Sequence, residues 1–151
     1  MRLVKMTQEE FDVIKGRMIR DYAQDKIKVG HWQEGDAIDL AKETLDNILK
    51  DGVETKHHYL LDICKDIDKV GFVWFNLFND TIYVNNYLIY DEYKGKDYEI
   101  NMVELLEEMA ENLDAKKVNL HSFGYNEGAI ALYRKMGYDI TDVYMSKKMG
   151  V

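Results

Sequence analysis

Proline is absent from this chain of 151 residues, cysteine occurs once, and no apolar run approaches the roughly 20 residues that a membrane-spanning helix needs. The single cysteine, Cys64, excludes an intrachain disulfide, and its place in an apolar strand pattern predicts a core residue rather than a nucleophile. The stretch from Met1 to Thr7 lacks the apolar core of a secretion signal. Together these absences predict a cytoplasmic protein without a membrane partner.

The sequence motifs of several functional classes are also missing. No spacing of cysteine or histidine suits zinc, and neither a Gly-x-Ser-x-Gly elbow nor a Walker loop occurs. Acidic residues outnumber basic ones by 28 to 20, which gives a formal net charge of −8. The sequence also has no cluster of basic and aromatic residues of the kind that binds nucleic acid. The acidic balance disfavours nucleic acid and favours cationic partners such as amines. We therefore expect no metal site and no nucleic-acid partner.

The pattern of apolar residues predicts a single domain over residues 1–151 with mixed elements. The apolar fraction of 46% is enough for one core at this length. Helical spacing predicts helices over 7–29, 38–49 and 99–112, the first opened by a capping box. Dense β-branched and aromatic residues predict strands at 3–6, a three-stranded antiparallel meander over 57–90, a strand at 117–123 and one or two strands over 138–149.

The most informative stretch lies beyond the strand at 117–123. Asn126 can cap a short helix, Gly137 can end it in the left-handed conformation, and Tyr133 lies in its middle. This element, followed by Met-Gly-Tyr, resembles the end of the GCN5-related N-acetyltransferase family, in which the helix tyrosine faces the sulfur of coenzyme A. The tracts Asp21-Tyr-Ala, 50–59 and 70–75 resemble a bacterial branch of that family, so the resemblance covers essentially the whole chain.

The resemblance implies an acyl-CoA N-acyltransferase fold. This is an α/β fold with a mixed, mostly antiparallel central sheet of six to seven strands and helices on both faces. The order of elements points the same way, because strands mixed with a β-helix-β unit indicate a sheet covered by helices on two sides.

The resemblance also places acetyl-CoA in a cleft where two neighbouring strands splay apart, with its pantetheine arm on strand backbone. The pyrophosphate would then meet a loop of pattern Gln/Arg-x-x-Gly-x-Gly/Ala and the start of a helix. Here that loop reads Lys94-Gly-Lys-Asp97-Tyr-Glu99, so acids stand at both motif glycines. Alternatively, Asp97 caps the helix and Glu99 complements its dipole, which supplies the anions from the protein itself. The implied cofactor-binding residues are Leu88, Ile89, Tyr90, Lys94, Gly95, Lys96, Asp97, Tyr98, Glu99 and Asn126.

Acetyl transfer to an amine needs a base for the incoming ammonium group and an acid for the departing thiolate. The resemblance implies that Tyr133 is the acid. Without the resemblance, its position in an amphipathic helix predicts a core residue. Relatives in this branch carry acidic residues on the strand before the loop, and the residues at those strand positions in this chain are Asn86 and Leu88. The candidate bases are therefore histidines, namely His57, His58 and His121, of which His121 lies beside the expected cleft.

Two functions follow from these residues. The first is an N-acetyltransferase that moves the acetyl group of acetyl-CoA to a primary amine of a small molecule or peptide, with Tyr133 and His121 as catalytic residues. The second is a noncatalytic binding or regulatory module of the same fold that has lost acetyl-CoA binding, which the residues at 86, 88, 97 and 99 favour. Exposed sheet edges and the habit of the family are compatible with a homodimer.

Overall fold

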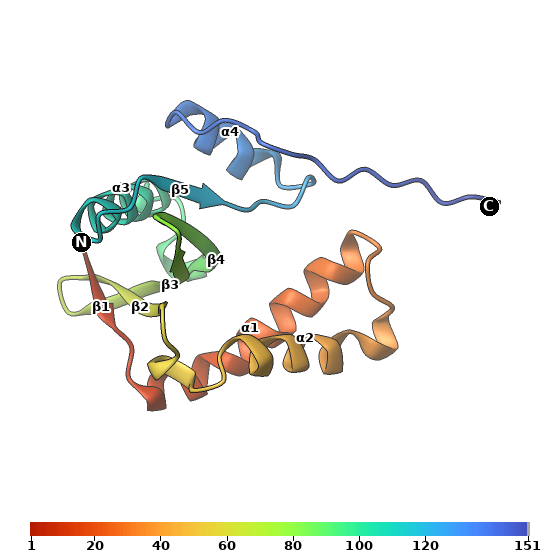
Figure 1. Cartoon of the computed structure of the whole chain (residues 1–151), viewed down its shortest axis with the longest axis horizontal. Coiled ribbons are helices and arrows are strands. Elements are labelled where there is room, and N and C mark those ends of the chain that lie inside the picture. Colours follow the sequence, from red (N-terminus) through yellow and green to blue (C-terminus); the bar gives the residue numbers. More distant parts are fainter. Residues whose placement is uncertain (151) are drawn as a thin grey trace. The chain divides into compact units, whose positions relative to one another are not determined.

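The computed structural model describes residues 1–150, and the chain divides into two compact parts (Figure 1). The first part, Met1–His121, holds the whole β-sheet and three of the four described α-helices, and the second begins at Ser122 and holds the fourth. The prediction of a single domain over residues 1–151 stays a prediction. Within the described residues, no helix combines the length and the apolar character needed to cross a bilayer.

The sheet has five strands in the order β1-β2-β3-β4-β5. The first four pair antiparallel, and β5 pairs parallel to β4, so the predicted α/β class with a mixed, mostly antiparallel sheet is confirmed. The predicted meander is also confirmed, since β2, β3 and β4 follow one another with short turns. The strands are β1 (Arg2–Lys5), β2 (His58–Lys65), β3 (Asp68–Phe78), β4 (Thr81–Ile89) and β5 (Lys117–Leu120).

The prediction of six to seven strands was wrong for the described part of the chain. Residues 138–149 have the composition of strands, but the described structure assigns no strand there. The strand predicted over 117–123 also ends early, at Leu120. Side-chain pattern alone indicates that a segment can enter a sheet, whereas the strand itself requires a partner.

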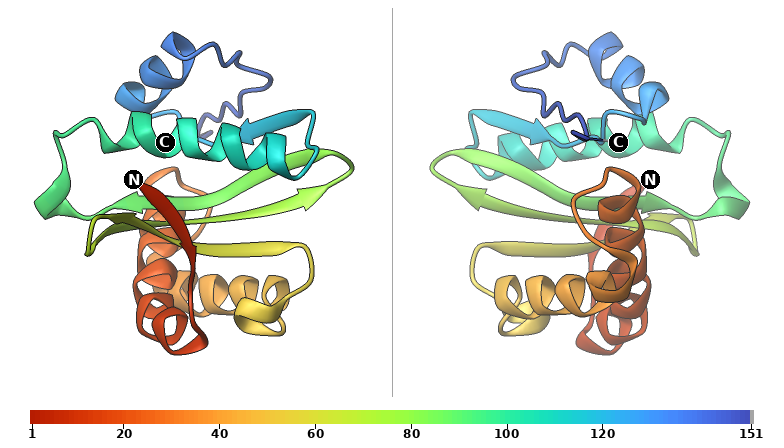
Figure 2. Two further views of the ribbon diagram at one scale, coloured as in Figure 1. Left: turned by 90° about the vertical axis from the view of Figure 1, so that its left-hand side faces the viewer. Right: turned by 90° about the vertical axis from the view of Figure 1, so that its right-hand side faces the viewer.

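Helices α1 (Gln8–Lys28) and α2 (Glu34–Ile48) cover one face of the sheet, and α3 (Tyr98–Asn112) covers the other (Figure 2). The predicted capping box opens α1: the Thr7 amide donates to Glu10 Oε1 at 2.9 Å, and the Glu10 amide donates to Thr7 Oγ1 at 3.1 Å. Because α1 and α2 lie on one face of the sheet and α3 on the other, the prediction of helices on both faces is confirmed.

Each face of the sheet has its own apolar layer. Toward α1 and α2, Phe11 and Met18 pack with Leu60, Phe72 and Trp74 of the sheet. On the opposite face, α3 contributes four buried residues. Cys64 of β2 is buried, as predicted for a core residue. The buried residues of α3 are Met102, Val103, Leu106 and Ala110.

Gly71 of β3 marks a close approach of backbone to backbone. It pairs with Ile89 of β4, and a Cβ atom built on it would overlap the carbonyl oxygen of Leu88 and lie 3.1 Å from Cα of Ile89. Because both neighbouring groups belong to the main chain, they cannot rotate away. Only glycine therefore allows β3 and the end of β4 to pair as they do.

Candidate functional site

The end of β4 separates from β5. The two strands pair only where Thr81–Val84 meets Lys117–Leu120, although β4 continues to Ile89. A register shift in the pairing with β3 leaves Asn85 as an extra residue, which is a β-bulge, and bulges bend the strand that carries them. On the side facing β5, residues 85–89 therefore have no strand beside them in the described sheet.

The predicted strand residues hold this end of β4 in place from both faces. Leu88 packs against the apolar layer under α1 and α2, whereas Ile89 is buried with 2% of its surface exposed. The Tyr90 amide donates to the Val70 carbonyl at 2.8 Å, which continues the β3 pairing one residue beyond the strand. The pairing with β3 therefore holds this end of β4 on one side.

The loop after β4 turns into α3 through two left-handed residues. Gly95 has φ = 80°, and Asp97 has φ = 60° and ψ = 21°. Glycine is favoured in this region, and aspartate is one of the few other residues that tolerate it. The backbone at Asp97 thus keeps a conformation that suits a glycine.

Asp97 occupies the N-cap position of α3, but its side chain makes no capping hydrogen bond, so the alternative in which it caps the helix was wrong. The left-handed backbone explains this, because N-cap residues that accept from the first turn normally have extended dihedrals. The Asn101 amide donates to the Asp97 carbonyl at 3.2 Å and begins the helical ladder. The amides that precede Asn101 have no acceptor within the helix, as at every helix start, and form a potential anion site.

The loop carries both charged and aromatic side chains. Lys94 Nζ lies 3.0 Å from Asp91 Oδ1, and this ammonium group lowers the pKa of Asp91. Lys96 Nζ lies 5.6 Å from the ring centre of Tyr93, whose ring in turn lies 6.4 Å from that of Tyr98. Both lysines are exposed and held by single weak contacts, so either can turn toward an anion at small cost.

A buried carboxylate near Tyr90 was not predicted from the sequence. Asp62 of β2 is 4% exposed, and burial raises its pKa. Its nearest cation is Lys69, at 3.6 Å, which also pairs with Glu10 of α1. Burial, followed by the charge of Asp62, raises the pKa of Tyr90. The signal in the sequence was a lone acid inside the apolar run of residues 59–64.

The three candidate bases lie at two separate places along the chain, at the start of β2 and at the end of β5. His57 and His58 stand at the start of β2, and β3 separates them from β4. His58 Nδ1 accepts from Trp74 Nε1 at 3.0 Å, which assigns its own proton to Nε2 in the neutral ring, and burial lowers its pKa. His121 directly follows β5, the strand beside β4. Among the histidines, it is the one that the chain order brings next to the point where β4 and β5 part.

The second part of the chain contains α4 (Glu127–Lys135). The Asn126 side chain caps this helix by accepting from the Ala129 amide at 3.4 Å, and Gly137 follows it with φ = 97°, so both predicted helix signals are confirmed. Tyr133 is buried, and its ring centre lies 6.2 Å from that of Tyr138. The proposed cofactor and catalytic roles of Asn126 and Tyr133 stay predictions.

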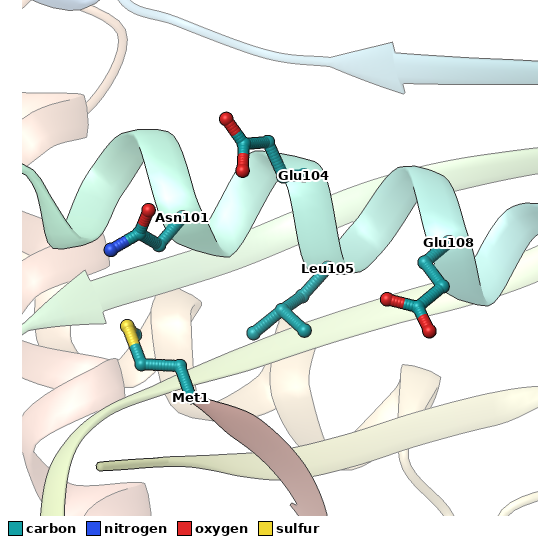
Figure 3. Close-up of a pocket in the computed structure, with 5 residues that line it drawn as sticks. All are labelled: Met1, Asn101, Glu104, Leu105 and Glu108. Carbon is teal, nitrogen blue, oxygen red and sulfur yellow. The ribbon is translucent and has the colours of Figure 1, made fainter.

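A separate shallow pocket of about 200 Å³ lies beside α3 (Figure 3). Asn101 and Leu105 extend from successive turns of α3 toward the side chain of Met1. Glu104 and Glu108 complete the lining, and none of these residues belongs to the predicted site. Across the described residues, no three His, Cys, Asp or Glu side chains are grouped to hold a metal ion.

Comparison with known proteins identifies the family. Residues 18–138 match the model of the acetyltransferase (GNAT) family. YdgE and YycN, two uncharacterized N-acetyltransferases of Bacillus subtilis (strain 168), are 30% and 32% identical to this chain, and each match covers 97% of both proteins.

Solved structures agree with this assignment. The crystal structure of YycN from Bacillus subtilis matches with a TM-score of 0.93 over 97% of both chains. PaiA N-acetyltransferase from Thermoplasma acidophilum, solved in complex with coenzyme A, shares the fold at 15% identity, with a TM-score of 0.68 over 95% of this chain and 92% of that one. With a family match over most of its length and relatives that align from end to end, the chain belongs to the acetyltransferase (GNAT) family.

Proposed function

We propose that this protein is an N-acetyltransferase that binds acetyl-CoA and transfers its acetyl group to a primary amine of a small molecule or peptide. The observation that carries the proposal is the separation of β4 from β5 after Val84, at the bulge of Asn85, followed within one loop by the start of α3. An extended ligand can pair with strand backbone where two neighbouring strands part. A phosphate group can then meet the helix amides.

The residues of the first part of the chain fit the cofactor. The pantetheine arm would lie along Leu88, Ile89 and Tyr90, and the pyrophosphate would lie against residues 94–99. The coenzyme A complex of the distant PaiA protein supports this choice of ligand, because that protein has the same fold. When bound, acetyl-CoA would supply an acetyl group already activated as a thioester.

Two side chains of this chain would then handle protons. We propose that the Tyr133 hydroxyl donates a proton to the departing sulfur and that His121 accepts one from the incoming ammonium group. Asn86 and Leu88 do not compete for the second role, since neither side chain takes up a proton at neutral pH. Asn126 would act by starting α4 and so fixing the position of Tyr133 along that helix.

The direct test is thermal unfolding in the presence of increasing acetyl-CoA. A ligand at a hundred times its dissociation constant stabilises the folded state by about 2.7 kcal/mol, which at this chain length raises the midpoint by roughly 5 to 11 °C. We expect such a rise with acetyl-CoA and a smaller one with desulfo or dephosphorylated fragments. A midpoint that does not move at millimolar acetyl-CoA would refute cofactor binding.

Removing the two loop charges is expected to strengthen binding of acetyl-CoA. Asp97→Asn with Glu99→Gln keeps side-chain size, and asparagine tolerates the left-handed backbone at position 97. A carboxylate about 4 Å from a phosphate costs on the order of 1 to 4 kcal/mol, so the dissociation constant measured by calorimetry should fall by about tenfold or more.

The matched control for the loop variant is Glu108→Gln. It removes a carboxylate from the same helix about 14 Å beyond position 99, farther than the screening length of about 8 to 10 Å at physiological salt. Its dissociation constant should therefore equal that of the unmodified protein. If the loop variant also shows no gain, the carboxylates point away from the phosphates and repulsion is not limiting.

The second candidate function, a noncatalytic module of the same fold, is favoured by one observation. Four carboxylates and only two lysines lie between residues 91 and 99, where an anion would bind. Under this function, the unmodified protein shows no thermal response to acetyl-CoA, whereas Asp97→Asn with Glu99→Gln gains one. The two titrations together therefore separate an active enzyme from a member of the fold whose cofactor site is closed by charge.

A further inference from the structure

The sheet face that packs under α1 and α2 changes from apolar to polar along its strands. Phe72 and Trp74 of β3 belong to the apolar layer, and Asn76 follows on the same face two residues later. Asn76 pairs with His58 of β2 and with Tyr83 of β4, so these two residues share its face. The apolar layer is therefore followed by a polar row that crosses several strands.

Asparagines dominate this row. Asn119 of β5 pairs with Tyr83 and extends the row to a fourth strand. The extra residue of the bulge also joins it, since Asn85 Nδ2 donates to Asn76 Oδ1 at 2.9 Å. At a strand spacing of about 4.8 Å, four strands give the row a length of roughly 14 Å. We call His58, Asn76, Tyr83, Asn85 and Asn119 the amide row, and none of the five is buried.

The amide row carries no formal charge at neutral pH. Asparagine and tyrosine are uncharged there, and burial lowers the pKa of His58, so its ring is neutral as well. On β5, the same face next carries Lys117, which lies one row further from the bulge. An amide offers donors and an acceptor at once, so the row suits another amide. A charged group of a ligand would lose water here without gaining a counter-charge.

The amide row lies beside the expected position of the acetyl group. In the proposed function, the pyrophosphate lies at residues 94–99 and the pantetheine arm at 88–90, so the thioester end extends toward the bulge at Asn85. The attacking nitrogen must come within about 3 to 3.5 Å of the acetyl carbon. The group next to that nitrogen on the acceptor therefore reaches the amide row, because one residue of extended chain spans about 3.3 to 3.6 Å.

We propose, as an extension that rests on the proposed function, that the acceptor is an α-amino amide, whose amide group hydrogen-bonds to the amide row while its amino group takes the acetyl group. In the reaction, a C–N bond forms at the acetyl carbon as the C–S bond breaks. The ammonium group loses two protons, and in balance the sulfur gains one and solvent gains the other. Small amino-acid amides and peptide N-termini both contain this group, so the two sources share one chemistry.

The decisive experiment compares the kcat/KM values of four acceptors with the full chain and saturating acetyl-CoA. The acceptors are alaninamide, the amide of trialanine, free alanine and putrescine. Rates are expressed per neutral amine, because the pKa of a peptide α-amino group and that of an alkylamine differ by roughly two units. We expect both amides to exceed alanine and putrescine by at least about tenfold, because a neutral partner keeps the hydrogen bonds of the row satisfied. The larger of the two amide values identifies the source, a free amide or a peptide.

The possible failures of this experiment are distinct. Equal values for the four acceptors, or a preference for alanine or putrescine, overturn the proposal. Acetylation of none of them, in a protein whose unfolding midpoint rises with acetyl-CoA, also overturns it but leaves cofactor binding intact. A midpoint that does not rise refutes the proposed function itself, and the inference about the acceptor with it.

A matched pair of variants tests the amide row directly. Asn119→Asp keeps the shape of the side chain but adds a carboxylate, so kcat/KM should fall by at least about tenfold for alaninamide and rise for putrescine. Asn112→Asp adds the same charge at the end of α3, which covers the opposite face of the sheet, and should leave both values unchanged. Equal effects of Asn119→Asp on the two acceptors would overturn the assignment of the row, and the acceptor series on the unmodified chain decides the matter if this variant misfolds.

Discussion

Replacing Tyr133 with phenylalanine is expected to lower the turnover number by about 100-fold while leaving the affinity for acetyl-CoA within a factor of about two. The ring stays in place, so packing in α4 is kept, and only the hydroxyl proton is lost. Without that proton the sulfur must leave as an unprotonated thiolate, which raises the barrier to the chemical step. Steady-state kinetics with an amine acceptor, together with calorimetry on acetyl-CoA, separates the two effects.

Tyr138→Phe is the matched control for this variant. It removes the same hydroxyl from a ring 6.2 Å from that of Tyr133, in the same part of the chain. We expect its turnover number to stay near that of the unmodified protein. If Tyr133→Phe turns over at the full rate, Tyr133 is not the acid, and if both variants fail equally, the effect belongs to the packing of the two rings.

Replacing Gly71 with alanine is expected to lower the free energy of unfolding by about 3 kcal/mol, or roughly 6 to 12 °C in the unfolding midpoint. The new methyl group would overlap the Leu88 carbonyl oxygen and crowd Ile89, both of which are main chain. The backbone itself must therefore move, and it must do so where the cofactor arm is proposed to pair. We expect the affinity for acetyl-CoA to fall along with stability.

The control for Gly71→Ala is Gly35→Ala, in the first turn of α2. A Cβ atom at position 35 would meet nothing within 4 Å, and alanine favours helix over glycine by about 1 kcal/mol. Denaturant unfolding should therefore show unchanged or slightly increased stability. A Gly71→Ala protein as stable as the unmodified one would mean that β3 and β4 can separate locally without loss, contrary to the close approach.

Local signals in the sequence predicted the elements well where they act over a few residues. The capping box at Thr7, the Asn126 cap and the left-handed Gly137 need only their own neighbours, and the structure has all three. Strand formation over 138–149 failed for the opposite reason, because a strand depends on a partner that is distant in sequence. The same limit hid the bulge at Asn85, which exists only in the register between β3 and β4.

Site residues show the same division. The order of the chain predicted that Leu88 to Tyr90 would lead into the loop and the start of α3, and they do. The sequence does not specify the dihedral angles at Asp97. The capping role considered for this residue was wrong because its backbone is left-handed. Asp62 was missed because an acidic residue in a strand is normally predicted to be exposed, and its burial depends on neighbours that are distant in sequence.

The left-handed backbone at position 97 bears on how readily this loop can change during evolution. If a loop position has ordinary negative φ, a change to the left-handed backbone that glycine favours requires the loop to refold. Here φ at Asp97 already has the sign that glycine favours. Codons for aspartate and glycine can differ at a single base, so one point mutation at position 97 would introduce glycine without a change in the backbone conformation of the loop.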